Sequence, residues 1–277
     1  MNNAVQVCPR FLDSRSGRLF LVEFAANSAD GDKEPVIIVP PFGEEMNRCR
    51  RMSALQGSAL ASAGHRTIMF DLYGTGDSEG EFVDADWETW QRNVADVIEW
   101  TTGEDRRGFS LLAIRLGALL AMSLDGDTLG RARRLIFWHP VSGGRMFLRQ
   151  FLRMRIAANL GTELEGSESI KSIMADLERG ETVEIGGYEL TASLASAIDG
   201  ATLDIEAGGP VPPVYWFDMS AVATESLSPA TGKLIEQLAG KGIAVNANAI
   251  EGESFWSTVE VTTAPGLLAA TSAVFAN

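Results

Sequence analysis

The fold is decided by the stretch Leu111-Leu112-Ala113-Ile114-Arg115-Leu116-Gly117-Ala118, which has the layout of a nucleophile elbow but carries arginine where the nucleophile belongs. An elbow is a sharp turn from a buried strand into a helix, and it requires small residues two positions before and after its central residue. Ala113 and Gly117 meet this requirement. The apolar run 109–113 and the Ala/Leu-rich stretch 118–122 predict the strand and the helix on either side. The pattern therefore predicts the turn, whereas an arginine side chain stays protonated and cannot attack a carbonyl.

Two further segments stand in the order expected around such an elbow. Asp71-Leu72-Tyr73-Gly74-Thr75-Gly76-Asp77-Ser78 matches the DxxGxGxS loop that α/β-hydrolases place after their fourth strand. Val39-Pro40-Pro41-Phe42-Gly43-Glu44-Glu45-Met46-Asn47 lies where that superfamily has its oxyanion loop, after the third strand. Together the three motifs predict an α/β-hydrolase fold.

Elsewhere the sequence alternates between strand and helix patterns, which is typical of a mostly parallel sheet covered on both faces. Residues 10–12 and 19–24 predict a hairpin across the turn at 13–17. We therefore expect an eight-stranded sheet with helices on both faces. The remaining strands are expected at 35–40, 67–71, 109–113, 135–139, 214–218 and 243–249, and helices at 54–63, 87–100 and 229–239.

The interval 143–209 interrupts this alternation because it carries no strong strand pattern. We predict that it forms a helical cap inserted after the sixth strand, between a first part of the core at 1–142 and a second part at 210–277. The cap begins at Ser142-Gly143-Gly144, a sequence typical of a flexible hinge.

The composition of the 277-residue chain excludes several classes of function. An apolar content of 45% suffices for one core domain with an insertion, and the net charge of −14 argues against a nucleic-acid partner. Cys8 and Cys49 make neither a disulfide framework nor a metal cluster, and no GxGxxG follows a strand, so we expect no metal and no dinucleotide cofactor. The first residues lack a signal-peptide pattern and no segment has the length of a membrane span, so cytoplasmic residence is the default expectation.

At a finer level the sequence resembles the α/β-hydrolase-like family called hydrolase 2 of the exosortase A system. The resemblance spans nearly the whole chain, and the residues that carry it are Pro40-Pro41-Phe42-Gly43-Glu44-Glu45-Met46-Asn47, Arg50-Arg51-Met52, 71–78, Arg115-Leu116-Gly117-Ala118-Leu119-Leu120-Ala121 and Phe255-Trp256. That family also lacks a serine at the elbow, so the resemblance implies that arginine here is a family feature. It further implies a bacterial protein associated with exosortase-type protein sorting and exopolysaccharide production, and it brings no established substrate.

The histidine of a Ser-His-Asp triad is also missing from its usual place. In an α/β-hydrolase it follows the last strand, and the sequence there is Ile250-Glu251-Gly252-Glu253-Ser254-Phe255-Trp256. Of the two histidines in the chain, His65 precedes the fourth strand in a tight surface connection and is expected to be structural. His139 ends the sixth strand at the carboxyl edge of the sheet, so it is either a catalytic candidate or the partner of a strand-end hydrogen bond. Asp218, which closes a later strand, is a further cleft candidate.

Arg115 needs an anion beside it, because a cation at a helix N-terminus costs about 0.3 to 1 kcal/mol. Glu44 and Glu45 of the oxyanion loop could reach across the cleft and hold the guanidinium as a buried pair. Alternatively, Arg115 and the free amides nearby could bind the carboxylate or phosphate of a ligand. The sequence slightly favours the internal pair, since two adjacent glutamates stand at the right loop without any assumption about a ligand.

The pocket at the elbow is expected to be lined by Phe42, Gly43, Leu116 and Phe255. Phe255 and Trp256 stand in the loop where the histidine would have been. Their rings could fill the vacated volume or form an apolar wall for a ligand, and the first interpretation is favoured.

The stretch 145–156 predicts an amphipathic helix at the start of the cap. Its apolar row is favoured as a lid over the mouth of the cleft. A basic amphipathic helix could instead make a peripheral contact with an anionic membrane, or recognise an acyl or polyprenyl phosphate. The two rows consist of Arg145, Arg149 and Arg153 on one side and of Phe147, Phe151 and Met154 on the other.

Two functional hypotheses follow from the altered elbow. The leading one is a non-hydrolytic protein that binds a small anionic or acylated ligand, or a partner, because the nucleophile and the histidine are both missing from an otherwise intact frame. The alternative is an ester or thioester hydrolase or acyltransferase, in which Glu44 or Glu45 acts as general base for water and Arg115 stabilises the oxyanion.

Overall fold

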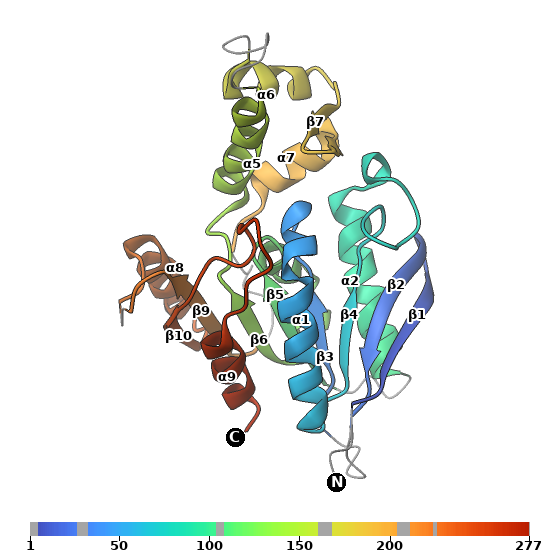
Figure 1. The fold of residues 1–277 in the computed structure, drawn as a ribbon, viewed down its shortest axis with the longest axis vertical. Coiled ribbons are helices and arrows are strands. Elements are labelled where there is room, and N and C mark those ends of the chain that lie inside the picture. The colour runs from blue at the N-terminus through green and yellow to red at the C-terminus, as the bar shows by residue number, and fades with distance from the viewer. Residues whose placement is uncertain are drawn as a thin grey trace.

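The computed structural model describes residues 5–26, 33–103, 108–159, 168–203, 211–223 and 226–276. Its main sheet consists of β1 (Val7–Ser14), β2 (Gly17–Phe24), β3 (Val36–Val39), β4 (Thr67–Phe70), β5 (Phe109–Ile114), β6 (Ala132–Trp138), β9 (Val214–Ser220) and β10 (Val245–Glu251). The strands lie in the order β1-β2-β4-β3-β5-β6-β9-β10 (Figure 1). β2 pairs antiparallel with β1 and β4, and the other neighbours are parallel. The predicted mostly parallel eight-stranded sheet is thereby confirmed.

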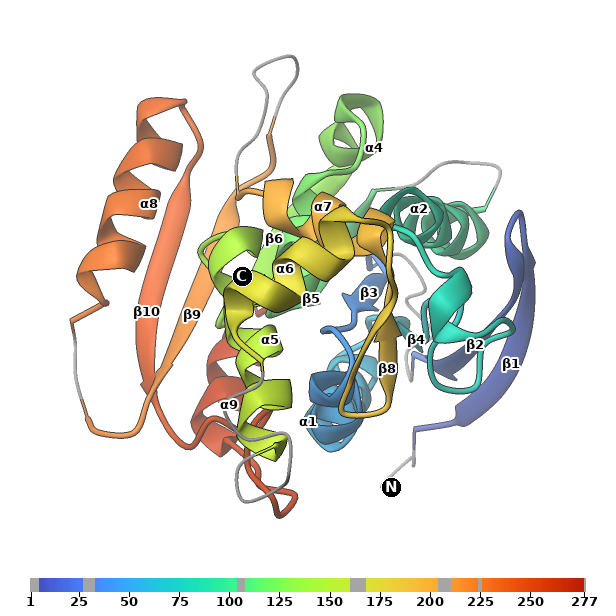
Figure 2. The ribbon, with the colours of Figure 1, turned by 90° about the horizontal axis from the view of Figure 1, so that it is seen from above.

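Helices cover both faces of this sheet, as Figure 2 shows from above. On one face lie α1 (Glu44–Ser62) and α9 (Pro265–Val274), and on the other lie α2 (Trp87–Thr102), α3 (Gly117–Met122), α4 (Gly126–Gly130) and α8 (Pro229–Gly240). Side chains along β3 alternate between the two cores, because successive residues of a strand point to opposite faces. Ile37 and Val39 pack into the core under α2 and α3, while Val36 and Ile38 pack against α1 and α9.

Helix α1 begins at Glu44, although the sequence pattern predicts a helix only from residue 54. Gly43 has a φ of 56° and turns the chain directly into the helix. Glu44 and Glu45 then form the acidic first turn, where their charges are stabilised by the helix dipole. The two glutamates therefore stand on a helix and not in the loop where they were predicted.

The DxxGxGxS segment forms a turn whose residues hold one another. The buried carboxylate of Asp71 accepts hydrogen bonds from Arg50 Nη2 at 2.9 Å and from the amide of Asp77 at 3.0 Å. Ser78 Oγ donates to the carbonyl of Asp71 and accepts from the amide of Phe20 on β2. A Cβ on Gly76 would lie 2.1 Å from Asp71 Oδ2, which explains the glycine. In this turn Ser78 is thus a structural residue.

The predicted cap interval contains α5 (Gly144–Ala158), α6 (Ile170–Glu178), β7 (Val183–Ile185), β8 (Tyr188–Leu190) and α7 (Ala192–Gly200), which lie at the top of Figure 1. The β7–β8 hairpin is not predicted, because strands of three residues are too short to give an alternating pattern. Tyr188 on this hairpin contacts the body through its hydroxyl, 3.4 Å from Glu44 Oε2, and its ring lies 5.1 Å from that of Phe82. Phe82 belongs to the short 3-10 helix η1 (Phe82–Asp84).

The glycine pair at the start of α5 lies close to the chain that follows α7. The amide of Gly144 donates to the carbonyl of Ala201 at 2.9 Å, and a Cβ on Gly144 would lie 1.6 Å from the carbonyl oxygen of Ile198. Gly143 forms a β-bridge with Thr202. A glycine is therefore required at 144, whereas nothing within 4 Å would meet a Cβ at Gly143, and the flexible hinge stays a prediction. Separately, none of the helices in the described ranges has the length and apolar character needed to cross a bilayer.

His65 lies in the interior and not in a surface connection as predicted, with only 3% of its surface exposed. Its Nδ1 lies 3.0 Å from the carbonyl oxygen of Glu34, its ring packs against Phe275, and its Nε2 is buried without a hydrogen-bond partner. Protonation would add a charge and a second N–H that has no acceptor. Burial, and secondarily the charge of Lys33, therefore lower the pKa of His65 to about 4.

This lowered pKa predicts a loss of stability in acid. The folded state binds the His65 proton only near pH 4, whereas the unfolded chain binds it near pH 6.5. Stability from the neutral ring is therefore present above pH 6.5 and is lost as the pH falls through 4, by up to about 1.4 kcal/mol per pH unit. The free energy of unfolding is measured with urea between pH 7 and 4 for the wild type and for His65→Gln. It should fall less steeply with pH in the variant; an equally steep fall would contradict the assignment.

Candidate functional site

Arg115 occupies the centre of the elbow, between β5 and α3. Its φ of 54° is the left-handed conformation that a nucleophile elbow imposes, and it costs a residue other than glycine about 1 to 3 kcal/mol. Its amide donates to the carbonyl of Trp138 at 3.0 Å, and its carbonyl accepts from the amide of Ala118 at 3.1 Å. A Cβ on Gly117 would lie 2.5 Å from the carbonyl oxygen of Pro40, so the predicted need for a small residue there is confirmed.

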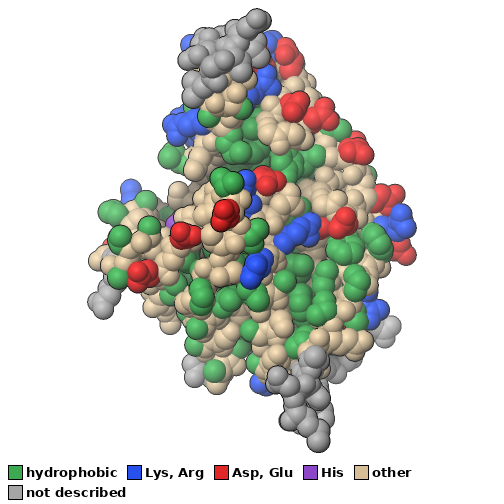
Figure 3. Space-filling view, viewed as in Figure 1, with side chains coloured by type: hydrophobic (Ala, Val, Ile, Leu, Met, Phe, Trp, Pro, Cys, Tyr) green, Lys and Arg blue, Asp and Glu red, His purple; other side chains and the backbone are tan. Residues whose placement is uncertain are grey.

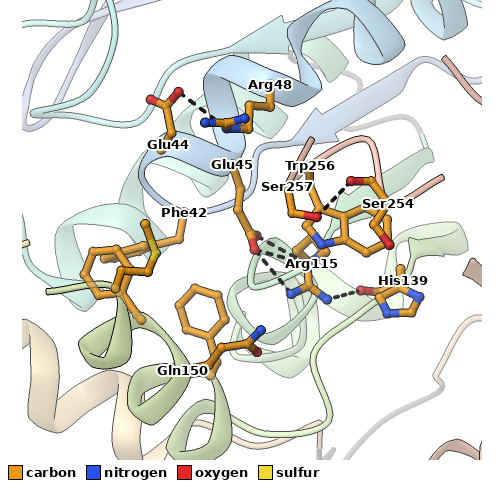
Figure 4. A pocket seen from close by; sticks show the side chains of 13 residues that line it. Phe42, Glu44, Glu45, Arg48, Arg115, His139, Gln150, Ser254, Trp256 and Ser257 are labelled. Atoms are coloured by element: carbon orange, nitrogen blue, oxygen red, sulfur yellow. Dashed lines mark hydrogen bonds and ion pairs between the residues drawn. The ribbon is translucent and has the colours of Figure 1, made fainter. Parts of the chain in front are cut away.

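The guanidinium of Arg115 is held inside the protein on three sides (Figure 4). Its Nε lies 3.3 Å from both carboxylate oxygens of Glu45, and its Nη2 lies 3.2 Å from Oε1. Its Nη1 donates to the carbonyl of His139 at 3.2 Å, and its central carbon lies 4.8 Å from the ring centre of Trp256. Only 8% of the side chain is exposed. The internal pair expected from the sequence is present in the structure.

Glu45 alone of the two glutamates makes this pair. Glu44 turns away toward Asn47, whose Nδ2 donates to it at 3.0 Å, and toward Arg48 at 3.5 Å. Burial raises the pKa of Glu45, and the neighbouring Arg115 lowers it by a smaller amount, so the carboxyl gives up its proton less readily than a free glutamate. Burial and the charge of Glu45 also raise the pKa of Cys49 well above its ordinary value, so this thiol is not a reactive nucleophile.

His139 directly follows β6, with a φ of 42°. The amide of Met219 donates to its Nδ1 at 3.0 Å, so the proton of the neutral ring lies on Nε2. The ring stacks on Trp256 with centroids 4.6 Å apart. Burial, followed by the charge of Arg115, lowers the pKa of His139 to about 4, although Asp218 opposes this shift. At neutral pH the residue is an uncharged hydrogen-bond donor.

Asp218 braces the end of β9. Its Oδ1 accepts from Trp216 Nε1 at 2.8 Å, and its Oδ2 accepts from Thr231 Oγ1 at 2.7 Å. The nearest carboxylate oxygen lies 3.7 Å from His139 Nδ1, which is already bonded to an amide. Both oxygens of Asp218 are thus engaged by side chains of β9 and α8.

A cavity of about 550 Å³ opens beside the Arg115–Glu45 pair. One wall is apolar and comes mainly from α5, whose Phe147, Phe151 and Met154 line it as the helical spacing predicts. Phe42 completes this wall, with ring centroids 5.0 Å from Phe151. We call this space the apolar cavity; its lining residues are Phe42, Glu44, Glu45, Arg48, Arg115, His139, Phe147, Gln150, Phe151, Met154, Ser254, Trp256 and Ser257.

A second cavity of about 530 Å³ shares Arg115 and His139 with the first and lies between α5 and the β9–α8 connection. Figure 3 shows a hollow in the outline of the molecule between α5 and α8. We call it the polar cavity, since hydroxyl and charged side chains line much of it. Its polar lining includes Arg115, His139, Ser142, Gln150, Arg153, Asp218, Ser220, Ser226, Ser228 and Thr231.

Three predicted pocket residues do not line either cavity. Gly43 turns the chain into α1, and Leu116 is buried at the start of α3. Phe255 is buried with its ring 6.0 Å from that of Trp138, and the adjacent Trp256 supplies the cavity wall in its place. The sequence does not distinguish these neighbours, because both are large aromatics in an irregular loop.

Sequence reasoning did not identify Arg48, Gln150, Ser254 and Ser257 as lining residues. Arg48 stands four residues after Glu44, a spacing that could have indicated an ion pair on one helix face. Gln150 follows Phe147 by one helical turn, which could have placed it on the same side of α5. Within the described ranges, no three His, Cys, Asp or Glu side chains gather as metal ligands would.

Comparisons with known proteins agree with this architecture. Residues 28–124 match the family model described as X-Pro dipeptidyl-peptidase (S15 family). Est1E from Butyrivibrio proteoclasticus, solved with ferulic acid bound, is similar over 96% of this chain and 98% of its own, with 14% identity and a TM-score of 0.65. Alpha/beta hydrolase domain-containing protein 10 from mouse aligns over 97% of this chain and 98% of its own, with 14% identity and a TM-score of 0.60.

A thioesterase domain from the curacin biosynthetic pathway is also similar, with 15% identity, a TM-score of 0.55 and coverage of 98% of this chain and 100% of its own. At such low identities the likeness concerns the arrangement of the backbone. The sheet order, the elbow geometry and these neighbours agree, and the chain has the α/β-hydrolase fold.

Proposed function

We propose that this protein binds an acylated or acidic small molecule in the apolar cavity and does not hydrolyse it by serine-type chemistry. The observation that carries the proposal is the state of Arg115. It takes the backbone position of the nucleophile, and its guanidinium is held by Glu45, His139 and Trp256. A charged group that cannot attack a carbonyl thus replaces the reactive atom, while the cavity beside it is kept.

The size and chemistry of the apolar cavity support a ligand of this class. Pockets of about 300 to 1,000 Å³ with mainly apolar walls suit small molecules, and this one has about 550 Å³. Aromatic side chains from α5 and from Trp256 would pack against an acyl chain or an aryl ring. Two structural neighbours are named for such chemistry: Est1E was solved with ferulic acid bound, and the curacin-pathway domain is a thioesterase.

The position of α5 favours the lid interpretation over a membrane contact. Phe147 and Phe151 point into the cavity, so their rings are not available to enter a bilayer. Arg145 and Arg155 are paired with Asp199 and Glu168. The resemblance to hydrolase 2 of the exosortase A system leads us to place the ligand in a pathway of protein sorting and exopolysaccharide production.

A second candidate function is suggested by Glu45. This carboxyl lines the apolar cavity, and its pKa is raised, so it could act as a general base for a water molecule. Arg115 would then stabilise the oxyanion formed from an ester or thioester. Water would add to the carbonyl carbon, its proton would pass to Glu45, and the alcohol or thiol would leave with that proton.

The first experiment distinguishes these two functions. Purified protein is assayed with p-nitrophenyl esters of two to twelve carbons and with acyl thioesters, and is separately treated with a fluorophosphonate probe. Binding of decanol and decanoate is measured in parallel by isothermal titration calorimetry. We expect binding, no turnover above the buffer rate and no fluorophosphonate adduct, because the two described serines that line the cavity, Ser254 and Ser257, form no hydrogen bond with a described histidine or carboxylate.

Arg115→Ala and Glu45→Gln are assayed beside the wild type, with Glu88→Gln as the matched control, because Glu88 is exposed on α2 and does not line the cavity. Turnover that is lost in the first two variants and kept in the control would establish the hydrolase instead. A fluorophosphonate adduct at Ser254 or Ser257 would contradict both mechanisms.

A further inference from the structure

We propose that the ligand is amphipathic, with its acyl or aryl part in the apolar cavity and an anionic head, a phosphate or a carboxylate, bound by Arg153 and His139 in the polar cavity. This inference rests on the proposed function and adds to it the class of ligand and the direction in which it lies. Three observations support it: the engagement of Arg115, the position of Arg153 and the residues that both cavities share.

The first step is that Arg115 is not available for an anion. All three of its guanidinium nitrogens are engaged, two by the carboxylate of Glu45 and one by the carbonyl of His139. The negative charge of Glu45 already neutralises the guanidinium when both are ionised. In the same cavity Arg48 is held by Glu44 and by the carbonyl of Thr258. An acidic ligand must therefore find its cation outside the apolar cavity.

The second step is that the polar cavity offers such a cation. Two arginines of α5, Arg145 and Arg155, form ion pairs with carboxylates of the cap. Arg153 forms no hydrogen bond or ion pair with any residue that the structure describes, and it lines the polar cavity. A guanidinium free at the edge of a hollow is suited to a phosphate or a carboxylate, because it presents several N–H donors in one plane.

His139 provides a neutral donor at the boundary of the same space. Because the amide of Met219 occupies its Nδ1, the proton is on Nε2, and His139 is a lining residue of both cavities. Asp218 is the one acidic side chain among the described lining residues of the polar cavity, and both of its oxygens already accept hydrogen bonds. Its charge weakens anion binding but does not occupy the donors.

The third step is the continuity of the two spaces. Four residues line both cavities, so the two spaces adjoin along them: Arg115, His139, Phe147 and Gln150. Each cavity has a volume above 500 Å³. A chain with an anionic end would thus have its apolar and charged parts matched separately.

The test compares three ligands with the same ten-carbon chain. Decyl phosphate, decanoate and decanol are titrated into the full-length protein below their micelle concentrations, and the dissociation constants are measured by calorimetry. At least one anionic ligand should bind about tenfold more tightly than decanol, as expected for one charge-assisted contact. The comparison of phosphate with carboxylate identifies which head the site prefers.

Two variants of α5 locate the subsites, and a third serves as control. Arg153→Gln should weaken the preferred anion about tenfold and leave decanol unchanged. Phe151→Leu, which alters only the apolar cavity, should weaken all binding ligands by a similar factor. Arg149→Gln, one turn away and outside both cavities, should change none of the constants, and circular dichroism should show that every variant is folded.

The outcomes separate the failure of this inference from that of the proposed function. If decanol binds as tightly as both anions, acyl binding stands and the anionic subsite is wrong. If Arg149→Gln weakens the anions as much as Arg153→Gln, general charge attraction explains the preference and the subsite is again wrong. If none of the three ligands binds, the proposed function fails and the inference fails with it.

Discussion

Methionine in place of Arg115 is expected to lower the free energy of unfolding by about 3 kcal/mol at pH 7. The carboxylate of Glu45, whose side chain is 21% exposed, would then face the apolar cavity without its cation, and Trp256 would lose the guanidinium packed on its ring. Methionine keeps an unbranched side chain, although a shorter one, and is strained by the positive φ just as arginine is. The loss should therefore report the ion pair and not the turn.

Removing both charges should restore most of this stability. In the double variant Arg115→Met/Glu45→Gln no uncompensated charge is buried, and a buried pair replaced by uncharged groups is often nearly neutral. Urea unfolding of the wild type, both single variants and the double variant gives the coupling energy directly. Arg145→Met, which breaks the exposed pair with Asp199, is the control and should cost less than about 1 kcal/mol. Equal stability of Arg115→Met and the double variant would show that Glu45 does not depend on the arginine.

The pH dependence of the same variant follows from the raised pKa of Glu45. Without Arg115, its charge and its hydrogen bonds no longer oppose the effect of burial, so the pKa of Glu45 rises further. A carboxyl whose pKa is raised by folding contributes stability below its unfolded pKa, and that contribution is lost as the pH rises through the folded pKa. The difference between Arg115→Met and the wild type should accordingly shrink as the pH falls from 7 toward about 4.

The fold was predictable because its motifs are local and their physical demands are specific. An elbow needs small residues at fixed positions, and Gly117 lies against the backbone of Pro40 as that rule requires. The DxxGxGxS loop is equally constrained, since Gly76 leaves room for the carboxylate of Asp71. Such requirements can be read from residue types alone.

The site was less predictable because it depends on the directions in which neighbouring side chains point, and the sequence does not specify these. Glu44 and Glu45 are neighbours of the same type, yet α1 begins at this point and turns only Glu45 toward Arg115. Phe255 and Trp256 differ in the same way, with one ring in the core and the other at the cavity. The start of α1 determines which glutamate faces Arg115, and the path of a loop determines which aromatic ring faces the cavity. Neither feature gives a periodic sequence pattern.

The elbow itself offers the second large effect, which is expected for Gly117→Ala. The added Cβ would lie 2.5 Å from the carbonyl oxygen of Pro40 and 2.9 Å from that of Val39, and both are backbone atoms that cannot rotate away. Helix α3 would have to move from β3, and we expect the free energy of unfolding to fall by about 3 kcal/mol. The same substitution at Gly232, inside α8 with no atom within 4 Å, should raise it by about 0.5 to 1 kcal/mol.

Thermal and urea unfolding of the two alanine variants would test this contrast with a single chemical change. Because Arg115 lies two residues before Gly117, a displaced α3 would also pull the guanidinium away from Glu45. The coupling energy between Arg115 and Glu45 should therefore be smaller when the double-mutant cycle is repeated in the Gly117→Ala variant. Similar effects of alanine at both glycines would mean that the close approach of α3 to β3 is not required. Loss of stability at Gly117 alone would show that the close approach of α3 to β3 is required in an elbow that has arginine at its centre.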